Sequence, residues 1–293
     1  MRQEYVRVAG CGQVAPGLHL LRLQAPWLAQ AARPGQFVHV RCGGSYDPLL
    51  RRPLSVHRVA RRSAREGDEV ARPQGERLGA APALAADIHE SDRATVGRLL
   101  AGEVALLFRV AGRGTAWLAA RKPGDEVDVL GPLGRPFAIS PSSRRLLLVA
   151  GGVGVAPLVM LAEEALAGGL AVALAAGARK AADIYPSHLL PPEVEYRVAT
   201  EDGSAGQRGL VTELLPDLLD WADEVCACGP LPMLAALKRL PRRLGSARVQ
   251  ASLEGHMGCA LGVCYGCVVE TRRGPQRVCQ DGPVFDLDQL ELA

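Results

Sequence analysis

Four of the eight cysteines crowd together near the C-terminal end of this 293-residue chain. Their spacing is Cys259-x4-Cys264-x2-Cys267-x11-Cys279. The first three follow the C-x4-C-x2-C pattern by which thiolates hold a [2Fe–2S] cluster, and in that pattern a fourth cysteine comes later. Thiolates are soft donors that suit iron in tetrahedral sulfur coordination. We therefore predict that these four cysteines bind one [2Fe–2S] cluster.

A structural zinc ion is the main alternative for these cysteines, because zinc is also held by four thiolates. Zinc sites usually show two short C-x2-C pairs, whereas this chain has one such pair and an additional cysteine ahead of it. Gly258, Gly262 and Gly266 lie among the cysteines, and glycine lets backbone N–H groups approach sulfur closely. The spacing thus favours the cluster. Cys11 and Cys42 stand apart and are expected to be ordinary apolar residues.

A glycine-rich turn, Gly151-Gly152-Val153-Gly154, joins an apolar run to a helical pattern that begins near Pro157. Glycines at such a turn let the backbone approach a phosphate, and the helix N-terminus adds partial positive charge. A turn without a ligand is the alternative. Cys228-Gly229-Pro230 and the acidic turn at Asp202 should lie at the same edge of a parallel sheet. The acidic turn fits a ribose hydroxyl or solvent contact equally well.

Two kinds of segment must position these residues. Short β-like runs with turn signals fill residues 1–136 and predict a small antiparallel barrel. From residue 144 to 253, continuous apolar runs alternate with helical patterns, which is typical of a parallel sheet covered on both faces. The expected strands are 35–41, 104–110 and 126–130 in the barrel and 146–150, 170–176, 195–200, 224–228 and 248–253 in the sheet. The expected helices are 156–167, 210–219 and 232–240.

We predict an α+β multi-domain protein in three parts. These are an antiparallel β-barrel over residues 1–140, a parallel α/β nucleotide-binding domain over 141–250 and a small C-terminal [2Fe–2S] module over 251–293. Residues 59–103 interrupt the barrel, because they are rich in Ala and Arg and lack β alternation. We interpret them as an inserted segment, in which residues 80–100 favour a helix.

Composition excludes several classes of protein. Hydrophobic residues make up 48% and charged residues 22%, as in a soluble globular protein, and the net charge of +3 gives no reason to expect nucleic acid. The longest apolar stretch, 146–162, contains glycines and a proline and falls short of the ~20 residues of a membrane span. Residues 1–10 lack the apolar core of a signal peptide, so a cytoplasmic protein is expected.

Several further segments, taken in chain order, resemble a known family. The segments are Arg51–Val56, Phe108–Thr115, Asp128–Gly134, Gly151–Pro157, Thr200–Ser204, Cys228–Pro230 and Val278–Phe285. On these segments the chain resembles the electron-transfer subunit of class 1B, NAD-dependent dihydroorotate dehydrogenase, within the ferredoxin-reductase superfamily. The resemblance covers nearly the whole chain apart from about residues 59–103.

This resemblance implies three cofactors: FAD on the barrel, NAD on the α/β domain and the [2Fe–2S] cluster. It implies FAD contacts from Arg52, Pro53, Leu54, Ser55, Leu107, Phe108, Arg109, Gly114 and Thr115, with Arg52 facing the pyrophosphate. It implies NAD contacts from Gly151, Gly152, Gly154, Asp202, Cys228, Gly229 and Pro230. It implies no catalytic acid, base or nucleophile.

The resemblance also implies a partner, an FMN-containing dihydroorotate dehydrogenase catalytic subunit, in a heterotetramer with two copies of each chain. Electrons from dihydroorotate would run through the FMN, the cluster and FAD to NAD⁺ in pyrimidine biosynthesis. Flavin can link a one-electron cluster to a two-electron nicotinamide. The alternative is an iron–sulfur flavoprotein NAD(P)H reductase subunit serving another partner, of the ferredoxin:NADP reductase or sulfide dehydrogenase type. A zinc-stabilised interaction protein without flavin belongs to a different class.

Three positions leave open questions. His57 follows the flavin segment where an apolar residue is expected. It either faces solvent or lies near the cofactor, and we interpret it as a surface histidine with satisfied hydrogen bonds. Arg179 and Lys180 either meet a 2′-phosphate or are plain surface charges, so the preference between NAD and NADP stays open. Tyr265 lies inside the cluster loop and is a candidate to shield the cluster from water.

Overall fold

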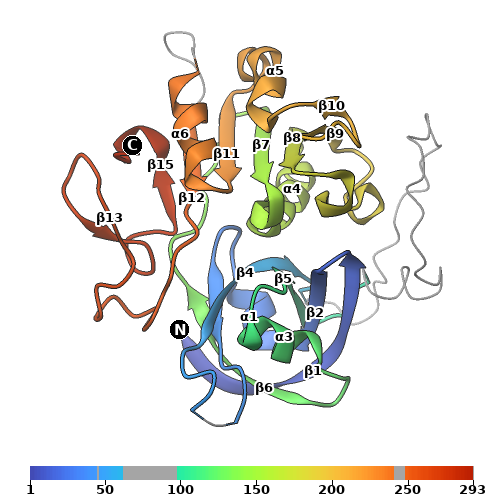
Figure 1. Ribbon diagram of the computed structural model, residues 1–293, viewed down its shortest axis with the longest axis vertical. Coiled ribbons are helices and arrows are strands. Elements are labelled where there is room, and N and C mark those ends of the chain that lie inside the picture. Colours follow the sequence, from blue (N-terminus) through green and yellow to red (C-terminus); the bar gives the residue numbers. More distant parts are fainter. Residues whose placement is uncertain (45, 62–97, 241–247, 293) are drawn as a thin grey trace.

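The computed structural model describes residues 1–44, 46–61, 98–240 and 248–292. A barrel and an open sheet stack along the long axis of the molecule, and the C-terminal segment lies beside them (Figure 1). Most of the predicted insertion over 59–103 lies outside the described residues, and so does most of its expected helix over 80–100.

Six strands close into an antiparallel barrel in the order β1-β2-β5-β4-β3-β6. They are β1 (Arg2–Ala15), β2 (Leu18–Gln24), β3 (Phe37–Val40), β4 (Arg52–Val59), β5 (Glu103–Arg109) and β6 (Glu126–Leu133), with helices α1 (Pro26–Ala31) and α3 (Arg113–Ala119) beside them. Alternate strand residues fill the interior, among them Val6, Leu21 and Val129. Because the barrel is closed, every strand is hydrogen-bonded on both sides and no strand edge is left unpaired. The predicted barrel is confirmed.

The second sheet has the strand order β10-β9-β8-β7-β11-β12-β15. Its strands are β7 (Arg145–Gly151), β8 (Ala171–Ala178), β9 (Glu195–Thr200), β10 (Gln207–Arg208), β11 (Glu224–Cys228), β12 (Arg248–Ser252) and β15 (Val284–Asp286). All neighbouring strands from β10 to β12 are parallel. The chain leaves β7 towards β8 on one side and returns to β11 on the other. Ligands bind at such a reversal, beyond the carboxyl ends of the strands.

Helices cover both faces of this sheet. They are α4 (Ala156–Ala167), α5 (Leu215–Trp221) and α6 (Leu231–Arg239), joined by the short 3₁₀ turns η1 (Gly152–Val155), η2 (Ala181–Asp183), η3 (Ser187–Leu189), η4 (Val211–Leu214) and η5 (Leu287–Gln289). The predicted helix over 156–167 is confirmed. The helix predicted over 210–219 is a 3₁₀ turn followed by α5, because Pro216 lacks the N–H that an α-helix through residue 212 would use.

The C-terminal segment packs against the α/β domain. Its strand β15 pairs antiparallel with β12 and covers what would otherwise be an open sheet edge. Cys267, Cys279 and Phe285 belong to the same apolar core as the β11 and β12 strands. The hairpin β13 (Val268–Val269) and β14 (Gln276–Arg277) lies beyond this core.

One apolar core joins the barrel to the α/β domain. Leu18, Leu20 and Leu107 of the barrel lie in the same cluster as Leu158 and Leu161 of α4. Helix α4 therefore lies between the two sheets, as Figure 1 shows. Among the described residues, no helix has both the length and the apolar character needed to cross a membrane.

Candidate functional site

The four C-terminal cysteines associate as two pairs. The thiol of Cys259 lies within hydrogen-bond reach of Cys264, and that of Cys279 lies within reach of Cys267. Backbone N–H groups also point at sulfur: Leu261 N lies 3.4 Å from Cys259 Sγ, and Cys279 N lies 3.4 Å from Cys267 Sγ. Two thiolates at each of two irons is the arrangement that a [2Fe–2S] cluster requires. The residues present therefore fit the cluster.

A structural zinc ion is the alternative occupant of these thiols. Within the described part of the chain, no three His, Cys, Asp or Glu side chains gather closely enough to hold one ion. Structural zinc needs four donors around a single point. Burial opposes ionisation of Cys259, but N–H donors from Leu261, Cys264 and Val263 outweigh it and lower the pKa of the thiol to about 6. Burial instead raises the pKa of Cys279 to about 12.

Arg277 holds the cluster loop in shape. Its Nη1 donates to the carbonyl of Gly262 at 2.8 Å, its Nε lies 3.1 Å from Asp281 Oδ2, and its guanidinium lies 5.4 Å from the centre of the Tyr265 ring. Tyr265 and Ala260 adopt left-handed backbone angles, φ 55° and 57°, that non-glycine residues rarely take. Such strain persists only where the surroundings enforce it. Tyr265 is 66% exposed and stands at the surface of the loop.

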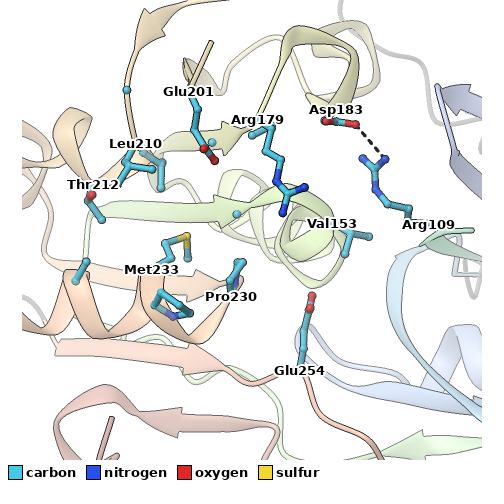
Figure 2. A pocket seen from close by; sticks show the side chains of 18 residues that line it. Arg109, Val153, Arg179, Asp183, Glu201, Leu210, Thr212, Pro230, Met233 and Glu254 are labelled. Atoms are coloured by element: carbon cyan, nitrogen blue, oxygen red, sulfur yellow. Dashed lines mark hydrogen bonds and ion pairs between the residues drawn. The ribbon is translucent and has the colours of Figure 1, made fainter. Parts of the chain in front are cut away.

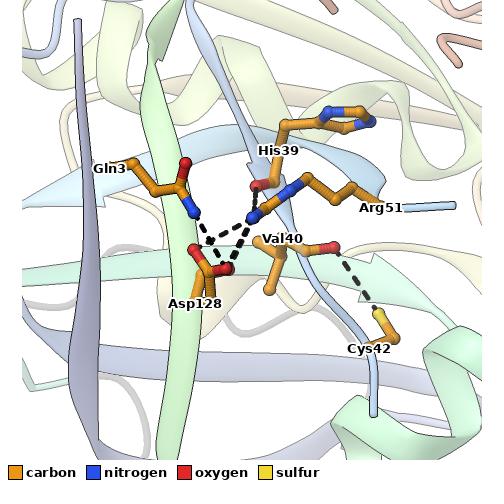
Figure 3. Close-up of polar contacts among 6 residues, drawn as sticks. All are labelled: Gln3, His39, Val40, Cys42, Arg51 and Asp128. Carbon is orange, nitrogen blue, oxygen red and sulfur yellow. Dashed lines mark hydrogen bonds and ion pairs between the residues drawn. The ribbon is translucent and has the colours of Figure 1, made fainter. Parts of the chain in front are cut away.

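The two arginines of the flavin segment have different surroundings (Figure 3). Arg51 donates to both carboxylate oxygens of Asp128, at 3.1 and 2.5 Å, and to the carbonyl of His39. Gln3 also donates to Asp128, so this ion pair fixes β1, β3, β4 and β6 together. Arg51 is thus a structural residue of the barrel.

Arg52, in contrast, faces the first turn of α3. Its guanidinium donates to the backbone carbonyls of Leu50 and Arg51, and a Cβ on Gly114 would come within 2.7 Å of its Nε. A charged group beside a side-chain-free backbone suits an anionic diphosphate. Thr115 does not present a free hydroxyl there, because its O–H donates to the carbonyl of Gly112 at 3.0 Å. Its Oγ also accepts the N–H groups of Ala111 and Gly112.

The remaining flavin candidates divide between surface and core. Along β4, Pro53 and Ser55 are partly exposed while Leu54 is buried, as expected where only alternate side chains face the barrel interior. Leu107 and Phe108 are each only 2% exposed. These two side chains therefore pack in the protein interior, and the partly exposed Pro53 and Ser55 have the surface that a flavin can cover.

A cleft of about 620 Å³ opens at the β7–β11 reversal. Gly151, Gly152 and Pro230 line it. Gly154 and Gly229 do not line it but let the two loops meet, since a Cβ on Gly154 would collide with the Cys228 carbonyl and one on Gly229 would come within 3.0 Å of Gly151. The glycine-rich turn and the Cys-Gly-Pro turn therefore form one packed rim, with the open space that a nucleotide needs.

Charged side chains also reach this cleft (Figure 2). Arg109, named above for FAD, lines the cleft and pairs with Asp183 at 3.0 Å. Arg179 and Glu201 line it as well. Arg179 directly follows β8, which ends at this edge of the sheet, and its position in the sequence therefore already indicated that it lies near the cleft.

Besides Gly154 and Gly229, two further candidates for nucleotide contact, Asp202 and Cys228, lie outside the cleft lining. Asp202 accepts the N–H and the hydroxyl of Ser204 at 2.9 and 2.6 Å, and these hydrogen bonds lower the pKa of its carboxyl. Cys228 is 1% exposed, and its thiol lies 4.0 Å from Glu254 Oε1. Glu254 does line the cleft, and burial raises the pKa of its carboxyl. Glu254 comes shortly after β12, which ends at the same edge of the sheet. This position indicated a cleft residue, although Glu254 was not among the predicted contacts.

Two buried histidines connect the barrel to the other parts. His39 of β3 has Nε2 3.1 Å from the carbonyl of Met257, just before the cluster loop. His57 of β4 has Nδ1 2.9 Å from the carbonyl of Ala156, the first residue of α4. The interpretation of His57 as a surface residue is wrong, since it is 0% exposed. A packed helix from 99 residues away covers it, and no local pattern indicates that contact.

Known proteins resemble this chain at two levels. Residues 254–291 match the iron–sulfur cluster binding domain of dihydroorotate dehydrogenase B. The chain is 37% identical over 288 residues to the dihydroorotate dehydrogenase B (NAD(+)) electron transfer subunit of Desulforamulus reducens, covering 95% of this chain and 94% of the relative. It is 35% identical over 296 residues to the subunit of the same name in Bacillus caldolyticus, covering 99% of each.

Solved structures with the same architecture include redox enzymes. A chain of the NADH-dependent reduced ferredoxin-NADP oxidoreductase, studied for flavin-based electron bifurcation, superposes with a TM-score of 0.75 at 25% identity, over 98% of this chain and 90% of that one. Phthalate dioxygenase reductase superposes with a TM-score of 0.54 at 15% identity, over 95% of this chain and 77% of that one, and shows likeness of fold alone.

Proposed function

This chain belongs to the family of dihydroorotate dehydrogenase B electron-transfer subunits, and from that premise we propose how its sites work together. It carries electrons from an FMN-containing dihydroorotate dehydrogenase catalytic subunit, through a [2Fe–2S] cluster and FAD, to NAD⁺. The spatial order of the sites carries the proposal. The barrel strands with the flavin segment are bonded through His39 to the cluster loop and through His57 to the helix after the nucleotide loop.

When bound, FAD supplies the exchange between one-electron and two-electron chemistry. The chain binds and orients it. Arg52 provides positive charge for the pyrophosphate beside Gly114, and Pro53 and Ser55 face the ring from β4. Arg51, locked to Asp128, keeps that strand in register with β3 and β6. Arg51 neutralises the buried carboxylate of Asp128, so Arg52 is the arginine of this pair that we assign to the pyrophosphate.

The cluster loop is the place where the catalytic subunit docks. Its exposed side chains are apolar: Leu261, Val263, Tyr265 and Val268 are 43%, 72%, 66% and 41% exposed. Adjoining exposed apolar side chains around a redox centre fit a protein partner better than water. Cys264 lies among them and is itself exposed. We assign the partner as the FMN-containing subunit, in a heterotetramer with two copies of each chain.

The nucleotide cleft accepts NAD⁺, as the names of the relatives indicate for those proteins. Glu201 provides a carboxylate for a ribose hydroxyl in place of Asp202, which is occupied by Ser204. None of the eight cysteines, all of which lie in the described residues, forms a disulfide, which suits a reducing cytoplasm. The reaction then belongs to pyrimidine biosynthesis.

A second candidate function rests on the solved structure with a TM-score of 0.75, which comes from a ferredoxin-NADP oxidoreductase. The chain would then reduce another carrier.

Co-expression with an FMN-containing dihydroorotate dehydrogenase subunit separates the two candidate functions. The proposal expects a stable complex that contains FMN, FAD, iron and acid-labile sulfide and that reduces NAD⁺ with dihydroorotate. A yellow-brown chain that forms no such complex, yet reduces a ferredoxin with NADPH, supports the second candidate. Colourless protein with stoichiometric zinc contradicts both.

A further inference from the structure

His57 lies where the two segments that hold the flavin and the nucleotide approach each other. It follows the flavin segment Arg52–Ser55 by two residues, and its acceptor Ala156 follows Gly154 of the nucleotide loop by two residues. The pairing of β4 with β5 shifts between Val56 and Arg58, so His57 sits at a bulge. Bulges re-aim side chains, and this one turns His57 out of the barrel towards α4.

Both ring nitrogens of His57 have partners from the α/β domain. Because the carbonyl of Ala156 can only accept, Nδ1 carries the proton and donates to it at 2.9 Å. Nε2 then accepts the hydroxyl of Tyr185 at 3.0 Å. The Tyr185 carbonyl in turn accepts the hydroxyl of Tyr196 at 2.9 Å. The contact is therefore a directed, fully satisfied bridge and not a loose apolar packing.

The bridge is shielded from solvent. His57 is 0% exposed and Tyr185 3%. Burial lowers the pKa of His57 to about 3, so the ring stays neutral at physiological pH. Two ion pairs flank the bridge, Arg58 with Glu163 at 2.5 Å and Arg61 with Glu164 at 2.8 Å. These pairs hold α4 on the barrel, and the bond from His57 reaches the first residue of the helix.

We propose that His57 is a positioning residue that sets the separation between the nicotinamide and the flavin by fixing the start of α4, and with it the loop Gly151–Gly154, against β4. The inference rests on the proposed function. His57 does not touch the reacting atoms: NADH gives up one hydride with its two electrons to become NAD⁺, and FAD takes it up to become FADH⁻. A displacement of about 1 Å in such a step can cost on the order of 10²-fold in rate.

Three replacements of His57 test this role in the intact chain with its cofactors. His57→Asn places an N–H donor near Nδ1 and preserves the bond to Ala156. His57→Gln reaches towards Tyr185 but loses the bond to Ala156, and His57→Leu loses both. We expect Leu and Gln to slow FAD reduction at saturating NADH by about tenfold or more, and Asn by less than about threefold. The dissociation constant for NADH should change by less than about twofold in all three, as a geometric role requires.

The readout is the first-order rate of flavin bleaching after rapid anaerobic mixing with NADH, with FAD and iron content measured for each variant. Equal slowing in Asn, Gln and Leu, or a wild-type rate in Gln, overturns the inference. A variant that raises the dissociation constant for NADH while leaving the rate unchanged also overturns it. If NADH does not bleach the flavin of the wild-type chain, the proposed function itself is wrong, and this outcome is distinct from the others.

Discussion

Replacing each of the two adjacent arginines of the flavin segment by methionine should change a different property. Arg51→Met should lower the stability of the protein, and Arg52→Met should lower its affinity for FAD. Arg51→Met removes the cation that faces Asp128, whose side chain is 3% exposed. Leaving a buried carboxylate without its partner costs about 3–5 kcal/mol. For a chain of this size, that corresponds to a fall in Tm of roughly 10 °C. Binding of FAD to the protein that remains folded should be affected much less.

Arg52→Met removes no partner of a buried carboxylate, so Tm of the apoprotein should change little. A hydrogen bond to a charged group contributes about 1.5–3 kcal/mol. Its loss should therefore raise the Kd for FAD by about 10- to 150-fold. Methionine keeps the unbranched apolar stem of arginine in both variants, so the comparison tests the guanidinium with its charge and hydrogen bonds.

The assay is a titration of each apoprotein with FAD, followed by flavin fluorescence, beside a thermal melt of the same samples. The reasoning is refuted if Arg52→Met keeps the wild-type Kd for FAD. It is refuted equally if Arg51→Met melts at the wild-type temperature, because the ion pair with Asp128 would then contribute nothing to the barrel.

Three further perturbations test other parts of the chain. Cys264→Ser should abolish electron transfer to the partner while NADH oxidation by an artificial dye persists, because hydride reaches FAD directly; equal loss of dye reduction with FAD still bound contradicts the proposed order. Arg277→Gln should release the cluster loop and speed the bleaching of the cluster in air by severalfold, measured by visible absorption, whereas an unchanged rate removes the role given to its bond with Gly262. Burial lowers the pKa of His57 to about 3 and of His39 to about 4, so below pH 6.5 the unfolded chain binds protons that the folded chain does not. Stability should therefore fall between pH 7 and 5 by about 2 kcal/mol for each histidine. In urea unfolding, His57→Leu should lose about 2 kcal/mol less over that interval than the wild type, and parallel pH curves for the two proteins contradict this expectation.

Much of the α/β domain could be predicted because its signals are local. Helix α4 matches the predicted range, since Pro157 marks its first turn and Gly168 follows its last residue. The strands β9 and β11 also match. In β11 a nearly continuous apolar run defines the strand, and in β9 the apolar Tyr196 and Val198 alternate with polar residues. Strand β15 was missed, as three residues in a Gly- and Cys-rich segment carry no usable period.

The candidate site could be predicted only in part, for a physical reason. The spacing of the four cysteines predicted that their thiols lie close together, because three of them lie within nine residues of one loop. We assign the ribose contact to Glu201 and not to Asp202, because the Asp202 carboxylate accepts the N–H of Ser204 two residues on. Asp commonly forms this kind of turn, so the sequence already indicated it. The bridge through His57 depends on tertiary contact with Ala156 and Tyr185, and nothing near His57 in the chain indicates it.

The order of the redox centres is tested most directly by rapid mixing of anaerobically purified chain with NADH, following flavin absorbance and the electron paramagnetic resonance of the cluster on the same time axis. The account predicts that the flavin bleaches first and that the signal of a reduced [2Fe–2S] cluster grows afterwards, with Cys264→Ser showing only the first phase. A cluster signal that precedes flavin bleaching, or a preparation with no iron and no acid-labile sulfide, would contradict it.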